Sequence, residues 1–199
     1  MLHTVIFIGR SGSGKGTQAG LFKDRKTKHD LDKRQILYVE TGQKFRDFIR
    51  GTSYSAHLSE KIYESDARQP DFLACLMWGG MLLEELEDNM HLVVDGAPRS
   101  LIEAQILNTA FDFYKRENIT VIHIDVSRKW SEDRLLARGR LDDTSLSKIN
   151  KRLDWFDKDV VPALEYFKSL KGYKFIEVNG EQPIEKVHLD IVAAYDYRK

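Results

Sequence analysis

A glycine-rich segment near the start of the chain has the residue types that bind phosphate. It spans residues 9–18 and reads GRSGSGKGTQ. Glycines let the backbone fold closely around an anion, so that successive amide N–H groups point inward, and Lys15 adds a positive charge at the terminal phosphates. The sequence therefore predicts a site for the phosphates of ATP, formed by Gly12, Ser13, Gly14, Lys15, Gly16 and Thr17.

The spacing departs at one position from the common phosphate-loop pattern. Gly9 to Lys15 fits G-x-x-x-x-G-K, after which the pattern has Ser or Thr. Here Gly16 follows, and the hydroxyl arrives one residue later at Thr17. The context is nevertheless the one the pattern requires, because an apolar strand is predicted at residues 5–8 and a helix directly after the loop.

The loop has to be positioned by an α/β fold. Apolar runs rich in β-branched residues alternate with helical patterns, which predicts a five-stranded parallel sheet with helices on both faces, the P-loop NTPase fold. Strands are predicted at residues 5–8, 35–40, 91–95, 120–126 and 173–178. Helices are predicted at residues 17–24, from 41, and at 56–65, 71–89, 100–117, 130–140, 145–170 (one or two) and 183–195, with 23–33 as a solvated helix end and loop.

Individual side chains receive predictions from the same patterns. Thr41 can cap the helix that it begins, Cys75 is expected in the core, and His123 is expected to be a satisfied buried or edge histidine rather than a base. Helical spacing assigns seven residues of the 71–89 helix to the core. These are Phe72, Leu73, Leu76, Met77, Met81, Leu82 and Leu86.

Composition bounds the function class. At 199 residues one domain is expected over residues 1–199, and the 31 basic and 31 acidic residues give no excess that would predict nucleic-acid binding. A single cysteine excludes an internal disulfide and a cysteine-rich zinc site, so no zinc is expected. We find no signal-peptide pattern and no membrane-spanning run, which predicts a cytoplasmic protein without membrane contact. Balanced charge and no obvious exposed apolar stripe favour a monomer.

Five ordered motifs resemble those of the adenylate kinase (nucleoside monophosphate kinase) family. Residues 9–18 resemble its G-x-x-G-S-G-K-G-T-Q loop, including the Gly after the Lys. Residues 41–46 resemble its T-G-x-x-x-R, residues 95–99 its D-G-F-P-R, and residues 140–143 its R-x-D-D. Asn179, Gly180 and Pro183 match near the end, so the resemblance covers almost the whole chain.

The resemblance implies a role for each matching residue. Lys15, Arg99, Arg138, Arg140 and Arg152 would stabilise the transferred phosphoryl group, and Asp95 would hold Mg²⁺ through water. Arg134 would lie against the donor adenine, with Arg138 and Gln182 also on the ATP side. The acceptor monophosphate would contact Thr41, Arg46, Gln69, Gly96, Arg99, Glu103, Arg140 and Arg152. Arginine suits such a site, because its planar fork donates bidentately to phosphate oxygens.

One departure leaves the acceptor base open. Adenylate-specific members of the family have Gln where this chain has Glu103, and Gln105 follows two residues later. An ionised Glu only accepts hydrogen bonds and would suit guanine N1–H and N2–H₂, whereas Thr41 favours AMP by resemblance. Glu103 can also be read as a solvated helix residue that Gln105 replaces.

Two other departures concern the lid and the loop. Only three residues separate Arg138 from Asp142, so the family's large lid insertion is absent, and a short lid is expected at residues 138–145. The acceptor-binding segment is expected at residues 41–70. Ala97 replaces a Phe, and Arg10 and Ser11 replace the usual pair after the first Gly. These changes are expected to tune packing or add a donor near the phosphates.

The predicted reaction is reversible phosphoryl transfer from MgATP to a nucleoside monophosphate, with AMP as the favoured acceptor (ATP + AMP = 2 ADP). The alternatives are a kinase for GMP, UMP or CMP, a P-loop kinase for another small acceptor, and a nucleotide-binding module without catalysis. A GTPase-type switch is disfavoured, because it needs N-K-x-D and residues 150–154 have the wrong spacing.

Overall fold

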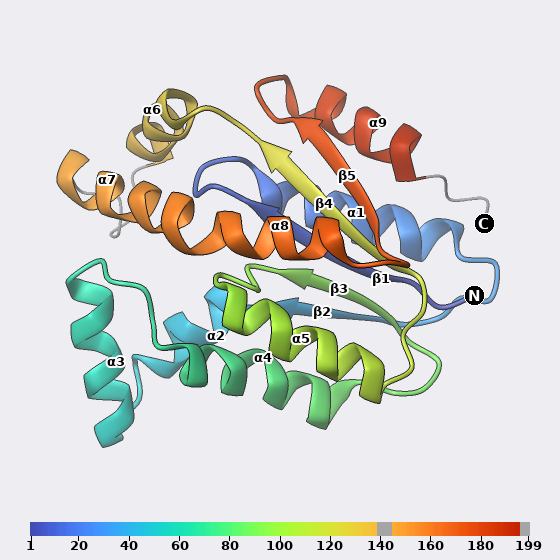
Figure 1. The fold of residues 1–199 in the computed structure, drawn as a ribbon, viewed down its shortest axis with the longest axis horizontal. Coiled ribbons are helices and arrows are strands. Elements are labelled where there is room, and N and C mark those ends of the chain that lie inside the picture. Colours follow the sequence, from blue (N-terminus) through green and yellow to red (C-terminus); the bar gives the residue numbers. More distant parts are fainter. Residues whose placement is uncertain (139–144, 196–199) are drawn as a thin grey trace.

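The computed structural model describes residues 1–138 and 145–195, which form an α/β fold around one parallel sheet (Figure 1). The strands lie in the order β2-β3-β1-β4-β5, which confirms the predicted five-stranded sheet. Their bounds are β1 Thr4–Gly9, β2 Ile36–Glu40, β3 His91–Asp95, β4 Ile119–Asp125 and β5 Lys174–Asn179. The helices are α1 Lys15–His29, α2 Thr41–Phe48, α3 Tyr54–Glu64, α4 Asp71–Glu85, α5 Leu101–Phe113, α6 Arg128–Arg138, α7 Leu146–Trp155, α8 Val161–Ser169 and α9 Ile184–Tyr195.

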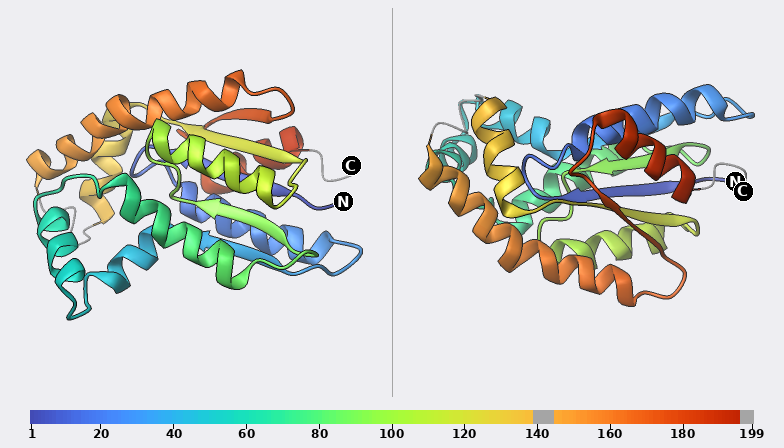
Figure 2. Two further views of the ribbon diagram at one scale, coloured as in Figure 1. Left: turned by 60° about the horizontal axis from the view of Figure 1, so that its bottom comes forward. Right: turned by 90° about the horizontal axis from the view of Figure 1, so that it is seen from above.

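Helices cover both faces of the sheet, as the right-hand view of Figure 2 shows. Alternate residues of a strand point to opposite faces, so each strand supplies two cores. Ile6 and Val94 pack with α4, α5 and α8 on one face, whereas Phe7 and Val93 pack with α1 and α9 on the other. This explains why β1 is apolar at consecutive positions instead of alternating.

Parallel pairing brings the chemically interesting strand ends to one edge of the sheet. β1 lies between β3 and β4, with Phe7 beside Asp95 and Gly9 beside Ile124. The glycine loop after β1 and the carboxylate that ends β3 therefore leave the sheet side by side. In an open parallel sheet this carboxyl edge is where ligands bind.

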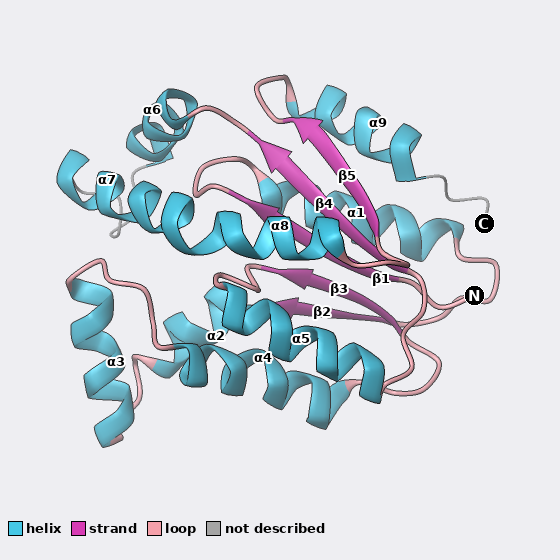
Figure 3. Ribbon diagram, viewed as in Figure 1, coloured by secondary structure: helices cyan, strands magenta, loops and turns pink. Residues whose placement is uncertain are grey.

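Helices α7 and α8 continue one another through a π-helical turn at Phe156–Val160, which we call the π turn. Figure 3 shows the resulting long helix running along the sheet. The sequence predicted one or two helices here, and the π turn accounts for the ambiguity. Such turns insert a residue into the helical ladder and are frequent at functional sites.

The exposed face of α4 contradicts part of the sequence prediction. Phe72 and Leu76 were expected in the core, yet they are 66% and 62% exposed. Ala74 and Trp78 are buried in their place. Because α4 is apolar on nearly all sides, spacing alone does not define which side faces the sheet.

The same helix face bears on the predicted oligomeric state. Phe72, Leu76 and Leu83 lie four and seven residues apart in succession, along one side of α4, and are all exposed. The assumption that the chain has no exposed apolar stripe was therefore wrong, and the prediction of a monomer now rests on balanced charge alone. No helix within residues 1–138 and 145–195 is long and apolar enough to cross a bilayer.

Helix α1 also extends beyond its predicted end near residue 24, because polar contacts bind its charged end to the start of β3. Lys26 is buried and lies 3.8 Å from a carboxylate oxygen of Asp30. The buried ring of His91 contacts the same oxygen at 3.0 Å, and the backbone N–H of His3 donates to the other ring nitrogen of His91. These four residues form a polar cluster at the sheet edge opposite the glycine loop.

The polar cluster predicts a loss of stability in mild acid. Burial and the charge of Lys26 lower the pKa of His3 from 6.5 to about 4. Between these values the unfolded chain binds more protons, so the free energy of unfolding falls as pH falls from 6.5 to 4, by about 1–2 kcal/mol after allowance for partial exposure. Urea denaturation across this range measures the slope.

Two variants separate this effect from general acid sensitivity. His3→Gln is expected to reduce the slope between pH 6.5 and 4, because His3 no longer titrates, while His91, whose pKa burial also lowers, still contributes. The exposed His57, replaced by Gln, is expected to leave the slope unchanged. Equal slopes in the wild type and His3→Gln would contradict the assignment.

Candidate active site

A cavity of about 660 Å³ opens at the carboxyl edge of the sheet. It lies where the glycine loop, the loop after β3, helices α2 and α3, and helices α6 and α7 converge (Figures 1 and 2). Most of the residues predicted for nucleotide binding line it. These are Gly12, Ser13, Gly14, Lys15, Gly16, Thr17, Arg46, Gln69, Asp95, Gly96, Arg99, Arg134, Arg138, Arg152 and Gln182.

The glycine loop has a backbone conformation that requires glycine. Gly12 and Gly14 have φ angles of 86° and 87°, in the left-handed region that other residues rarely adopt. Gly14 is also the N-cap of α1, so the first amides of the helix follow directly at Lys15. This combination presents backbone donors and the positive end of a helix to the cavity, which is a general means of binding phosphate.

The packing of Gly16 explains the departure from the usual phosphate-loop pattern. A Cβ atom at this position would lie 3.1 Å from Oδ2 of Asp95, too close for ordinary contact. The Tyr38 hydroxyl donates to the same oxygen at 3.0 Å and fixes the carboxylate. Burial and the neighbouring Asp95 raise the pKa of Tyr38, so the phenol stays protonated and remains a donor.

A second corner of the cavity, lined by two arginines, forms where the N-terminus of α2 meets the loop after β3. A Cβ atom on Gly42 would lie 3.4 Å from Nη1 of Arg46 and 3.6 Å from Nη2 of Arg99. The two guanidinium groups therefore lie near each other, and both lie close to the backbone of Gly42, which has no side chain. Gly96, with φ of 82°, keeps its Cβ position 3.5 Å from Arg99 and completes the corner.

Neighbouring groups hold both arginines in place. Nε of Arg99 donates to the Gly96 carbonyl at 2.9 Å, and the guanidinium lies 5.9 Å from the centroid of the Trp155 ring. Arg46 donates to Glu40 at 3.0 Å. Burial lowers the pKa of Arg99, although the nearby carboxylates of Glu103 and Asp95 oppose that shift. Because the ordinary pKa is so high, Arg99 remains charged at neutral pH.

Thr41 and Glu103, which gave opposing predictions for the acceptor base, do not line the cavity among the described residues. Each is only 1% exposed. The prediction that Thr41 caps α2 was wrong, because Glu40 is the N-cap position and the Thr41 hydroxyl has no hydrogen-bond partner in the described part of the chain.

Glu103 is not a solvated helix residue, so that reading is also wrong. Its carboxylate lies 3.6 Å from Nη1 of Arg68 and interacts with the positive charge of Arg99. Burial raises its pKa, and the arginines counteract the shift. Gln105 is exposed and does not line the cavity either. In this structure Glu103 thus acts as a buried counter-charge behind two arginines that do line the cavity.

The remaining predicted residues have their own supports. Gln69 hydrogen-bonds through both ends of its amide to Ser59, and Arg134 lies over the ring of Trp130 at 5.2 Å. Gln182 donates to the Asn179 carbonyl at 2.8 Å. Arg140 and most of the predicted lid at residues 138–145 lie outside the described residues.

The structure also tests the predictions made for the loop residues Arg10 and Ser11 and for His123. Arg10 does not add a donor to the cavity, because its guanidinium binds the Val126 carbonyl and Asp157, whereas Ser11 does line the cavity. His123 was expected to be a satisfied histidine. It is buried and hydrogen-bonds to Glu177 at 3.1 Å, as predicted.

Sequence reasoning missed several cavity residues on the acceptor side, among them Tyr38, Tyr63, Arg68 and Trp155. Tyr38 lies in β2 two residues before the strand ends, a position that could have identified it. Arg68 lies in a loop and matches no motif, because only the fold places it beside Glu103.

The site consists of a phosphate loop, a fixed carboxylate beside it and arginines that converge from five segments of the chain. A cavity with this composition stabilises the charge of phosphoryl transfer, which defines an enzyme of the P-loop nucleotide kinase class. The family model described as "Adenylate kinase" matches residues 7–172. The chain belongs to the adenylate kinase family.

Full-length relatives agree with the family assignment. The chain is 27% identical over 192 residues to an adenylate kinase of Prochlorococcus marinus, with 96% of this chain and 97% of the relative covered. It is 29% identical to an adenylate kinase of Flavobacterium psychrophilum, with 94% of each chain covered. An adenylate kinase of Azobacteroides pseudotrichonymphae is also 29% identical, with 98% of each chain covered.

Proposed function

We propose that this enzyme catalyses the reversible transfer of the γ-phosphoryl group of MgATP to AMP, giving two ADP. The observation that carries the proposal is one cavity with two anion-binding corners, the glycine loop with Lys15 and the corner of Arg46 and Arg99. Two corners in one cavity suit two phosphate-bearing ligands that face each other, as transfer without loss to water requires.

On the donor side, the glycine loop would hold the α- and β-phosphates through its amides, and Lys15 would reach the β- and γ-phosphates. Arg134 and Arg138 project from α6 into the same cavity. Arg134 would lie against the adenine. Gln182, on the loop after β5, would form part of the wall of the donor pocket. A short lid at residues 138–145, which carries Arg140, would close over the phosphates.

On the acceptor side, we assign the binding segment to residues 41–70. Arg46 and Arg99 would hold the monophosphate at the corner formed by Gly42 and Gly96. Gln69, held by Ser59, would face the base and fix its position. Thr41 and Glu103 lie behind the cavity wall: Glu103 stabilises Arg68 and Arg99, and Thr41 is buried at the start of α2.

The chemistry requires positioning and positive charge more than a base. An oxygen of the acceptor phosphate forms a bond to the γ-phosphorus, and the bond from that phosphorus to the bridging oxygen of ATP breaks, with the electron pair leaving on ADP. Negative charge spreads over the equatorial oxygens of the phosphoryl group in transit. Lys15, Arg99, Arg138, Arg140 and Arg152 would stabilise that charge in a cavity that excludes water.

The residues present fit Mg²⁺ with its nucleotide. Asp95 offers a fixed carboxylate beside the glycine loop, and Gly16 leaves the space next to Oδ2 that a side chain would fill. A hydrated Mg²⁺ binds through few carboxylates and keeps several waters, so one Asp is sufficient. The ion would neutralise phosphate charge. We further propose that the enzyme acts in the cytoplasm as a monomer.

Acceptor choice is tested by supplying MgATP with AMP, GMP, UMP or CMP, one at a time, and measuring ADP formation. AMP is expected to give the highest kcat/KM, by about tenfold or more, because Glu103 is held by arginines and is not available to read guanine. A higher kcat/KM with another monophosphate would assign this protein to the alternative class. ATP binding without turnover on any monophosphate would indicate a binding module.

A further inference from the structure

The π turn carries two aspartates whose partners lie on different sides of the cavity. Asp157 and Asp159 are two residues apart, and the inserted residue of a π turn changes the direction in which they point. Arg152 and Trp155, directly before the turn on α7, both line the cavity. The turn therefore connects to the site through the helix that it interrupts.

Asp157 is bound to the glycine loop. Nη1 of Arg10, the second residue of the loop, forms an ion pair with Oδ1 of Asp157. Nε of the same guanidinium donates to the Val126 carbonyl at 3.2 Å, and its carbon lies 4.6 Å from the centroid of the Phe156 ring. Three contacts thus fix Arg10 between β4 and the π turn, and with it the first part of the loop.

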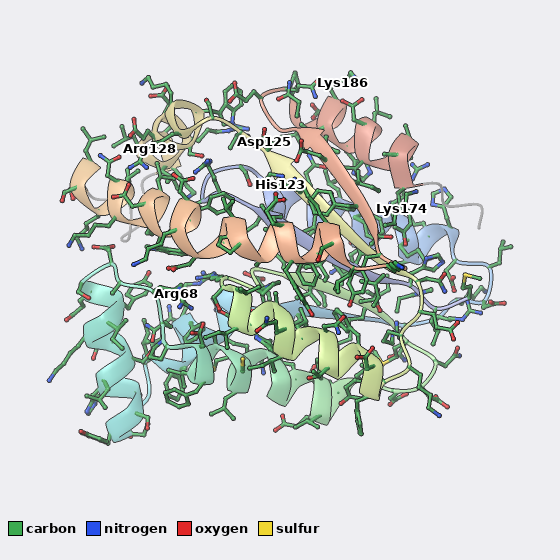
Figure 4. All side chains as sticks on the ribbon, viewed as in Figure 1. Arg68, His123, Asp125, Arg128, Lys174 and Lys186 are labelled. Atoms are coloured by element: carbon green, nitrogen blue, oxygen red, sulfur yellow. The ribbon has the colours of Figure 1, made fainter. Side chains whose placement is uncertain are left out.

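Asp159 is bound to the acceptor segment. Nε of Arg68 donates to Oδ2 of Asp159 at 3.2 Å, and Nη1 donates to Oδ1 of Asp71 at 2.5 Å. The same nitrogen lies 3.6 Å from Glu103. Arg68 belongs to the loop that leads into α4, and Figure 4 shows it beneath the long helix of α7 and α8. One guanidinium thus joins α4, α5 and the π turn, next to Gln69.

We propose that Asp157 and Asp159 are positioning residues, and that the π turn sets the distance between the donor and acceptor corners of the cavity. Asp157 holds the donor loop through Arg10, and Asp159 holds the acceptor segment through Arg68. The inference rests on the proposed function, since it assigns one nucleotide to each corner.

The environment of the ion pair between Arg68 and Asp159 supports this role. The side chains of Arg68 and Asp159 are 20% and 25% exposed, so water screens their attraction less than it screens a surface pair. A second contact, between Lys148 of α7 and Asp66, joins the acceptor segment to the helix that precedes the π turn. Removal of Asp159 leaves Arg68 bound to α4 and α5 and leaves the Lys148–Asp66 pair in place, but removes the bond between the π turn and Arg68.

Alanine variants of the two aspartates test the proposal by separating the two substrates. Asp159→Ala is expected to raise the KM for AMP about tenfold and to change the KM for MgATP less than twofold. Asp157→Ala is expected to show the reverse. The matched control is Asp154→Ala, since Asp154 also pairs with Arg128, as Asp157 does, but has no bond to Arg10 or Arg68 in the described structure. It is expected to change neither KM.

The same variants give a readout that does not require turnover. In the nucleotide-free protein, Asp159→Ala is expected to speed amide hydrogen exchange in residues 54–69, and Asp157→Ala in residues 10–14. If the wild type does not phosphorylate AMP, the proposed function fails while exchange still decides the inference. Equal exchange in Asp159→Ala and the wild type, or KM changes of equal size for both substrates, would overturn it.

Discussion

Replacement of Lys15 by Met is expected to lower kcat for ADP formation by about a thousandfold with little change in stability. Lys15 is the first residue of α1 and lines the cavity, so its ammonium group can follow the phosphoryl group in transit. Methionine keeps most of the length and the helix propensity but has no charge. The substitution therefore destabilises the transition state but not the folded protein.

The measurement is steady-state kcat with MgATP and AMP, together with the thermal midpoint of unfolding. Lys28→Met is the matched control, because Lys28 lies on the same helix and is exposed far from the cavity. It is expected to retain wild-type kcat. A Lys15→Met enzyme with kcat within tenfold of the wild type would contradict the assignment of the donor site.

Arg99→Ala is expected to lower kcat/KM for AMP by about a thousandfold and also to destabilise the fold. Arg99 lies at the acceptor corner and is a partner of the buried Glu103. Without the arginine, the carboxylate loses a compensating charge, which costs about 1–3 kcal/mol. The pKa of Glu103 would rise further than burial already raises it, so the stability loss would be greater at high pH, where the carboxyl must ionise.

The double variant Arg99→Ala/Glu103→Gln separates the two effects. Its neutral amide removes the uncompensated charge, so the stability should recover while kcat/KM for AMP stays low. Urea denaturation and steady-state kinetics on the same samples measure both quantities. Recovery of kcat/KM in the double variant would show that Arg99 acts through the fold and does not contact the acceptor.

Local patterns in the sequence were sufficient to predict the sheet and the donor half of the site. The strands of a parallel sheet are buried on both faces, so β1 and β3 appear as continuous apolar runs. The phosphate loop is contiguous in sequence, and its glycines occur where the backbone needs them. Asp95 was identifiable because it ends a strand beside β1.

The acceptor half depended on contacts that no local pattern contains. Whether Glu103 faces the cavity or the arginines depends on where α5 packs and on Arg68, which lies 35 positions earlier in the chain. The buried side of α4 was also ambiguous, since Leu76 and Trp78 are both apolar and only the contact with the sheet selects Trp78.

The most direct test of the central claim supplies purified enzyme with ADP and Mg²⁺ alone and follows all three adenine nucleotides by chromatography. If one cavity holds a donor and an acceptor adenylate, ADP is converted into equal amounts of ATP and AMP until equilibrium, and Lys15→Met makes the conversion about a thousandfold slower. A kinase for another acceptor cannot produce AMP from ADP in this way. Unchanged ADP with the wild-type enzyme would contradict the account.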